Sequence, residues 1–118
     1  MTITEFYKAV GGSYNEVINR LMTDKRILTY LNKFVSAGDY SELLNAIDAE
    51  DWETGFRASH NLKGVSLNLG LGDLAKSSSE LCETMRPGKK PEIDITSLLE
   101  QVKVDYAKTV ALIPEVEN

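Results

Sequence analysis

The chain has 118 residues, of which 42% are hydrophobic and 26% are charged, and its formal net charge at pH 7 is −5. This length and composition predict one globular domain, residues 1–118, with a core of its own. The acidic balance argues against nucleic-acid binding, which needs a basic surface, and weakly against an anionic membrane surface.

The first residues carry no export signal. The run from Met1 to Phe6 has neither the basic start nor the apolar centre of a signal peptide. No apolar run in the chain approaches the ~20 residues that span a bilayer. The one cysteine, Cys82, cannot form an internal disulfide. We therefore expect a cytoplasmic protein that does not enter a membrane.

Helix-start signals recur along the first half of the chain. In three places a capping side chain is answered by a carboxylate three positions later. These pairs are Thr2 and Glu5, Ser13 and Glu16, and Asp39 and Glu42. Thr23 and Asp51 are further candidate N-caps. Gly38 and Gly70 fit helix ends, where a left-handed residue is favoured.

Between these signals the apolar residues recur at helical spacing, and no segment alternates as a strand would. The apolar faces fall within residues 27–35, 43–47, 55–69, 71–85 and 95–113. Two prolines and a glycine in 86–91 predict a loop between two long antiparallel helices. Pro114 ends the last helix, and we expect residues 114–118 to be frayed. The sequence thus predicts an all-α, up-down antiparallel four-helix bundle with additional short N-terminal helices.

His60 is the only histidine, and it lies in the middle of a predicted helix. At about 100° per residue it points roughly 160° away from Leu62, which belongs to the apolar stripe of that helix. The imidazole therefore faces solvent. Histidine is the side chain that is largely neutral and nucleophilic near pH 7, so an exposed one on a rigid helix invites a chemical interpretation.

Two residues one turn after His60 strengthen that interpretation. Lys63 places a cation where it could stabilise a phosphoryl group on the ring; alone, it would be an ordinary solvated lysine. Gly64 costs about 0.5–1 kcal/mol relative to alanine in mid-helix. On an outer face close helix packing does not explain it, so we expect it to clear space for a bulky group or a partner. Gly55, on the buried stripe, is explained by packing.

Four further residues form a candidate docking surface around the imidazole: Phe56, Arg57, Leu67 and Asn68. Phe56 and Leu67 are large apolar side chains that the helical phase leaves exposed, as in a docking surface. The alternatives are that the helical phase is off by about 40°, or that a neighbouring short helix covers Phe56. Arg57 is by itself equally consistent with a solvated surface charge.

The segment 60–70, HNLKGVSLNLG, followed by Leu74 and Leu81, resembles the histidine-containing phosphotransfer (HPt) domain. The core pattern of that family is H-x-L-K-G-x-[SA]-x-x-[LIV]-G. Residues 43–52 also look like the short helix and turn that precede it. The recognisable part of the chain covers residues 40–86.

The resemblance implies roles for individual residues. His60 would be the phosphoacceptor, Lys63 would stabilise the phosphoryl group, and Gly64 would leave room for it. The family often has Glu or Gln on the next helix near the imidazole. The aligned residue here is Cys82, with Glu83 just after it, so what orients the ring is left open.

The resemblance also implies a function. His60 would accept a phosphoryl group from a receiver-domain aspartate and pass it to another receiver in a two-component phosphorelay. The partners would be response-regulator receiver domains and a hybrid histidine kinase. Mg²⁺ is expected on the receiver, with no metal or cofactor on this chain. Gly70-Leu71-Gly72 is too short for a nucleotide-binding motif, so we expect a monomeric covalent carrier without kinase activity of its own.

Three alternatives stay open. The first is a helical protein-interaction module with the same fold and no phosphotransfer. The second is a metal-binding bundle, which a single histidine without a Glu-x-x-His pair disfavours strongly. The third is a dimerising or phosphatase-like bundle that uses the histidine for other chemistry.

Overall fold

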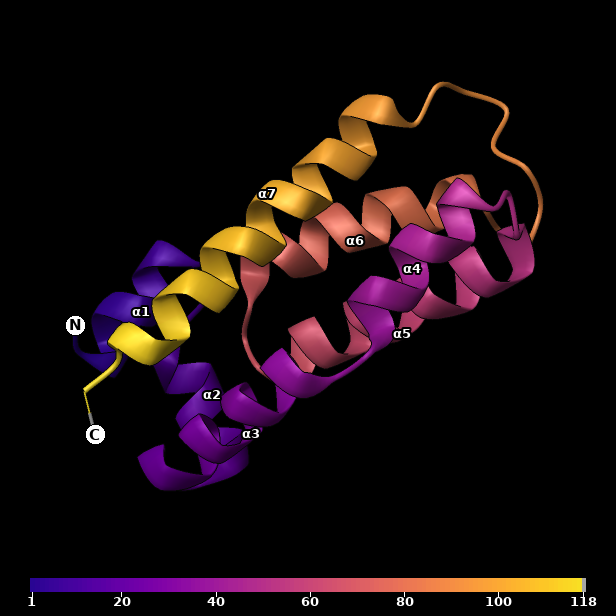
Figure 1. Ribbon diagram of the computed structural model, residues 1–118. Coiled ribbons are helices and arrows are strands. Elements are labelled where there is room, and N and C mark those ends of the chain that lie inside the picture. Colours follow the sequence, from indigo (N-terminus) through magenta and orange to yellow (C-terminus); the bar gives the residue numbers. More distant parts are fainter. Residues whose placement is uncertain (118) are drawn as a thin grey trace.

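The computed structural model describes residues 1–117, and all of their regular elements are helices (Figure 1). No strand occurs among these residues, so the all-α prediction is confirmed. The elements are α1 (Ile3–Ala9), α2 (Tyr14–Leu21), α3 (Asp24–Ser36), α4 (Asp39–Asp48), α5 (Trp52–Asn68), α6 (Gly72–Thr84), α7 (Thr96–Leu112) and a 3-10 turn, η1 (Ile113–Glu115).

Four long sides make up the bundle. Helices α3 and α4 follow one another along one side, and α5, α6 and α7 form the other three (Figure 1). Helix α5 packs chiefly against α4 and α6, and α6 packs against α7. The short helices α1 and α2 cover one end of a molecule that measures 43 × 21 × 21 Å. This is the predicted four-helix bundle with additional N-terminal helices.

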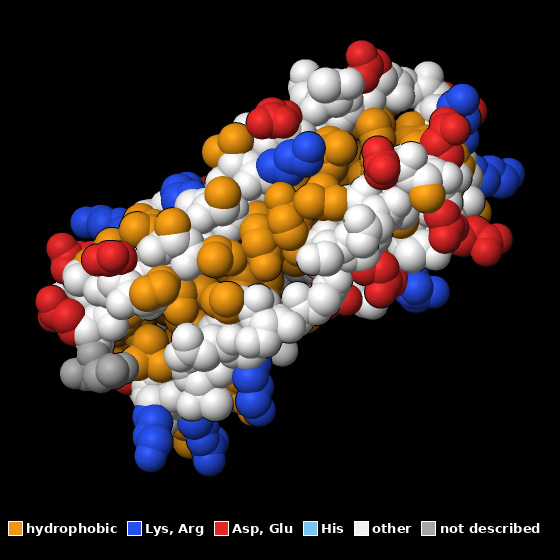
Figure 2. Space-filling view, in the orientation of Figure 1, with side chains coloured by type: hydrophobic (Ala, Val, Ile, Leu, Met, Phe, Trp, Pro, Cys, Tyr) orange, Lys and Arg blue, Asp and Glu red, His pale blue; other side chains and the backbone are white. Residues whose placement is uncertain are grey.

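The side between α7 and the α3–α4 pair is closed by side chains. Figure 2 shows hydrophobic side chains gathered there in a band along the molecule. Tyr40 of α4 stacks on Tyr106 of α7 with ring centroids 3.7 Å apart, and Phe34 packs against the same ring at 5.6 Å. The aromatic contacts therefore join α7 to both α3 and α4.

Most helix starts form as the caps predict. The Thr2–Glu5 pair makes a full capping box, and the side chains of Ser13, Thr23 and Asp51 each accept a backbone N–H of the first turn. None of these caps needs support from a distant part of the chain. They are therefore local features that the sequence carries by itself.

The start of α4 differs from the prediction. Asp39 is the first helical residue and not the cap, and Gly38 is the N-cap, with φ −89°. The chain leaves α3 through an extended Ala37, so no left-handed residue is needed at Gly38. In the first turn, the Asp39 carboxylate is still favourably placed against the positive end of the helix dipole. Gly70, with φ +72°, does end α5 as expected.

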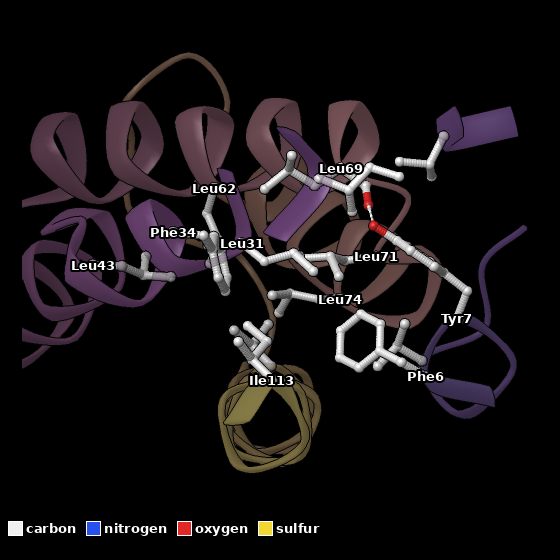
Figure 3. Packing of buried hydrophobic residues seen from close by; sticks show 14 of the residues in the cluster. Phe6, Tyr7, Leu31, Phe34, Leu43, Leu62, Leu69, Leu71, Leu74 and Ile113 are labelled. Carbon is white, nitrogen blue, oxygen red and sulfur yellow. Dashed lines mark hydrogen bonds between the residues drawn. The ribbon is translucent and has the colours of Figure 1, made fainter. Parts of the chain in front are cut away.

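The core lies where the apolar faces predict it (Figure 3). Leu62 of α5, Leu74 of α6 and Val102 of α7 are each at most 1% exposed. Phe6 and Tyr7 of α1 are completely buried at the end of the same cluster. Helix α1 is therefore part of the core and not an attachment to it.

The expectation of a frayed tail is wrong for residues 114–117, and residue 118 lies outside the described residues. The Met1 amino group donates to the Glu115 carbonyl at 2.7 Å, and the Glu117 N–H donates to the Met1 carbonyl at 2.9 Å. Val116 is only 8% exposed and packs with the core. The tail is ordered because it buries this side chain and pairs with the other end of the chain.

Two glycine turns cross where the N-terminal helices meet the bundle. A Cβ at Gly12 would overlap the Gly70 carbonyl oxygen, and a Cβ at Gly72 would overlap the Gly11 carbonyl oxygen. The Asp73 N–H donates across the crossing to the Val10 carbonyl at 3.0 Å. The α1–α2 turn and the α5–α6 turn can approach this closely only without side chains.

Two side chains reinforce this crossing. The buried Tyr7 hydroxyl donates to the Leu69 carbonyl at 2.9 Å (Figure 3). Arg20 of α2 donates to the carbonyls of Leu67 and Asn68, both at 3.2 Å. These carbonyls lie in the last turn of α5, where the regular helical partners are missing, and the Leu67 carbonyl also accepts the Gly70 N–H at 3.2 Å. Helix α2 thus caps the helix that carries His60.

The crossing predicts a sharp contrast between two glycines. We expect Gly12→Ala to lower the free energy of unfolding by about 1–3 kcal/mol, because the added methyl group must push two backbones apart. Gly38→Ala should lower it by no more than about 1 kcal/mol, because a Cβ there meets nothing within 4 Å and only the poorer N-capping by alanine is left. Urea unfolding followed by circular dichroism measures both. Equal effects would contradict the role of the crossing.

Candidate functional site

His60 lies at the middle of α5 and is exposed, as the helical phase predicts. The opposite face of α5 is buried and consists of Gly55, Ala58, Ser59, Leu62 and Ser66. Since α5 turns this face to the core and has α4 and α6 on its two flanks, the imidazole points outward between them. The rigid helix fixes the backbone under the ring.

Gly64 leaves open space one turn from the imidazole. An added Cβ at this position would meet no atom within 4 Å, so nothing in the folded chain requires glycine there. At Gly55 the opposite holds, since a Cβ would come within 3.0 Å of the Met85 sulfur. The distinction drawn from the sequence between a packing glycine and an access glycine agrees with this geometry.

Lys63 lies on the flank of α5 that faces α6 and is half-buried. Its positive charge acts on Glu83 of α6. The hydrogen bond from Arg86 lowers the pKa of Glu83 below its ordinary value, and attraction to Lys63 adds to this lowering. Two cations, Lys63 of α5 and Arg86 just after α6, therefore act on Glu83 at the side of α5 that faces α6, which we call the edge of the His60 face.

Phe56 is half-buried and not fully exposed. Its ring centroid lies 6.1 Å from that of His60, with 30° between the ring planes. The Arg86 guanidinium covers it at 5.1 Å from the ring centroid. Phe56 is therefore partly covered, but by the single residue Arg86 just after α6 and not by a neighbouring short helix.

The other three candidate docking residues lie on the outer face of α5. Leu67 is 56% exposed, and Asn68 is exposed at the end of the helix. Arg57 is exposed as well, but its guanidinium pairs with Glu42 of α4 at 2.7 Å. Arg57 thus links α5 to α4. A docking role for these residues stays a prediction.

Cys82 does not reach the imidazole. It is 1% exposed, and its thiol donates to the Phe56 carbonyl at 3.8 Å. Among residues 1–117 no protein group hydrogen-bonds to the His60 ring. Cys82 therefore fixes the backbone one turn before His60, and the position where the family often has a polar partner is occupied by a buried thiol.

Sequence reasoning missed Arg86 at this site. It was read as part of the loop that follows α6, and only the packing of α6 beside α5 brings it over Phe56. The same loop then passes along the start of α5, where a Cβ at Gly88 would lie 3.2 Å from the Glu53 side chain. The spacing of Glu83 and Arg86 is typical of a helical ion pair and indicates that the two side chains meet. It does not indicate that the pair lies beside α5.

Two other kinds of feature are absent from residues 1–117. No group of three or more His, Cys, Asp or Glu side chains in this range is arranged to hold a metal ion. None of the described helices is both long and apolar enough to cross a membrane.

Comparison with known families gives one match. The family model described as the Hpt domain matches residues 34–107, well over half of the chain. The chain belongs to the Hpt domain family. No curated protein and no solved structure matches it. Hpt domains carry out histidine phosphotransfer in phosphorelays, and the matched region contains α4, α6 and the whole of α5, which carries His60.

Gly64 provides a test of access to the site of this Hpt domain. We expect Gly64→Leu to leave the helix intact or slightly more stable, because glycine costs about 0.5–1 kcal/mol in mid-helix. Phosphotransfer should nevertheless slow strongly, since the new side chain fills the space beside the imidazole. Stability is measured by urea unfolding, and transfer by the uptake of radioactive phosphate from a charged receiver domain.

Gly64→Ala is the matched control for this substitution. It gives the same helix propensity gain but adds only a methyl group to open space, so it should slow transfer far less than leucine. Unchanged transfer in Gly64→Leu would show that glycine is not there for access.

Proposed function

We propose that this Hpt domain accepts a phosphoryl group on His60 from the phosphoaspartate of a response-regulator receiver domain. It then passes the group to the aspartate of another receiver in a two-component pathway. The observation that carries the proposal is the exposed imidazole at the family's motif position. Lys63 lies one turn on, and the space at Gly64 is open.

The transfer needs only one nucleophilic ring nitrogen. The lone pair of neutral His60 forms a bond to phosphorus as the bond between phosphorus and the aspartate oxygen breaks. The electron pair of that broken bond stays on the aspartate carboxylate. The proton on the other ring nitrogen stays in place, so the product is a phosphoimidazolium. The second transfer reverses these steps on another receiver.

This chain contributes position and charge to the reaction. Phosphoryl transfer depends mostly on holding the groups in line and on neutralising the phosphoryl oxygens. Helix α5 holds the ring on a rigid backbone, and the Lys63 ammonium is placed to neutralise part of the charge. The open space at Gly64 lets the donor approach.

We further propose that the chain is a monomeric carrier and not an enzyme with its own turnover. Hpt domains in general are phosphocarriers without kinase activity. The phosphoryl group would come from a receiver, such as that of a hybrid histidine kinase, and Mg²⁺ would be held by the receiver. The competing proposal is a helical interaction module of the same fold that transfers nothing.

Labelling separates these two proposals. We expect a receiver domain charged with radioactive phosphate to label the wild-type chain and to leave His60→Gln unlabelled. Acid lability and base stability of the label would identify phosphohistidine. A wild type that takes no label, or a His60→Gln variant that labels equally, would favour the interaction module. Circular dichroism checks that the variant is folded.

Chelation tests where the metal acts. We expect EDTA to stop transfer between the charged receiver and the chain, because the Mg²⁺ belongs to the receiver. The thermal unfolding midpoint of the chain alone should not move when EDTA is added. A shift of that midpoint would instead reveal a metal ion bound to this chain, since a ligand that binds the native state raises its stability.

A further inference from the structure

Arg86 and Glu83 form an ion pair at the edge of the His60 face. The Arg86 Nη2 atom lies 2.9 Å from Glu83 Oε1, and Nε lies 3.2 Å from both carboxylate oxygens. The Arg86 and Glu83 side chains are 48% and 56% exposed. An exposed pair of this kind is weak, so another anion can replace the carboxylate.

The guanidinium of this pair contacts the same aromatic ring that lies next to the imidazole. It rests over Phe56 at 5.1 Å, and Phe56 in turn lies 6.1 Å from His60. Phe56 and His60 are one helical turn apart on α5. A guanidinium stacked on a ring can slide along it while it keeps the contact, and the long arginine side chain gives it reach toward the imidazole.

Glu83 is paired with Arg86, and the more distant charge of Lys63 on α5 also attracts it. While His60 is unmodified, Glu83 is therefore the anion bound to Arg86. A phosphoryl group on His60 would bring two negative charges and three oxygen acceptors to the same side of the molecule.

We propose that Glu83 is a latch that holds Arg86 over Phe56 while His60 is free. When His60 is phosphorylated, the phosphoryl group displaces Glu83, and Arg86 joins Lys63 in neutralising it. This inference rests on the proposed function and assigns Arg86 to phosphoryl binding and Glu83 to positioning. Arginine suits the exchange because its planar fork binds a carboxylate or a phosphoryl group with two parallel hydrogen bonds.

The equilibrium constant for transfer from a charged receiver to the chain tests the latch. Docking affects the rates but cancels in this constant, which reports only the relative stability of the phosphorylated chain. We expect Glu83→Gln to raise the constant about threefold and Arg86→Gln to lower it about threefold or more, as expected for exposed charges at this range. Arg86→Lys should fall between Arg86→Gln and the wild type.

The double variant distinguishes a latch from simple charge repulsion. If Glu83 acts by holding Arg86, then adding Glu83→Gln to the Arg86→Gln variant should leave the equilibrium constant for transfer nearly unchanged. Additive effects of the two substitutions would overturn the latch. The matched controls are Glu80→Gln on α6 and Arg26→Gln on α3, which remove the same charges elsewhere on the exposed surface and should leave the constant within about twofold of wild type.

A second measurement needs no receiver. Phosphoramidate phosphorylates exposed histidines directly, and the Arg86 Nε–H signal in an NMR spectrum, identified by its loss in Arg86→Lys, reports the partner of the guanidinium. We expect this signal to shift when His60 is phosphorylated, and an unmoved signal would overturn the latch. If a receiver does not label the chain but phosphoramidate does, the proposed relay fails while the latch is still decided by this signal.

Discussion

The burial of one face of α5 against its neighbours is the constraint on which the rest of this structure depends. Once Ala58, Leu62 and Ser66 face the core, the helical repeat forces His60, Gly64 and Leu67 to face outward. The chemistry proposed for His60 is thus set by packing on the far side of the same helix. The turn at Gly70, the Arg20 cap and the buried Cys82 thiol all hold this helix in place.

The cations near His60 are opposite in sign to the net charge of the whole chain. The protein carries a net charge of −5, yet Lys63 lies one helical turn from His60, and Arg86, which is paired with Glu83, stacks on the neighbouring Phe56. A site that must alternate between a free ring and a phosphorylated one gains from such an arrangement. A fixed excess of cations would hold the phosphoryl group too firmly to pass it on, whereas cations shared with a carboxylate can be released again.

The parts of the structure that were predictable from the sequence are those fixed by local spacing. The phase of α5, the exposure of His60 and the caps at Thr2, Thr23 and Asp51 each follow from residues within a turn or two. The parts that were missed depend on contacts between distant segments. Arg86 reaches Phe56 only because α6 packs on α5, and residues 114–117 are held by the burial of Val116 and by hydrogen bonds to Met1. Neither contact can be predicted from the spacing of helical signals along the sequence.

The crossing of the two glycine turns has a consequence for where this domain begins. The family match starts at residue 34, which leaves α1, α2 and most of α3 outside it. Yet Phe6 and Tyr7 complete the core, and their removal would uncover Leu69 and Leu71 at the end of the α5–α6 pair. The segment shared with the family is therefore smaller than the unit that folds. Cutting the chain at the family boundary would produce an open-ended bundle with its apolar interior facing water.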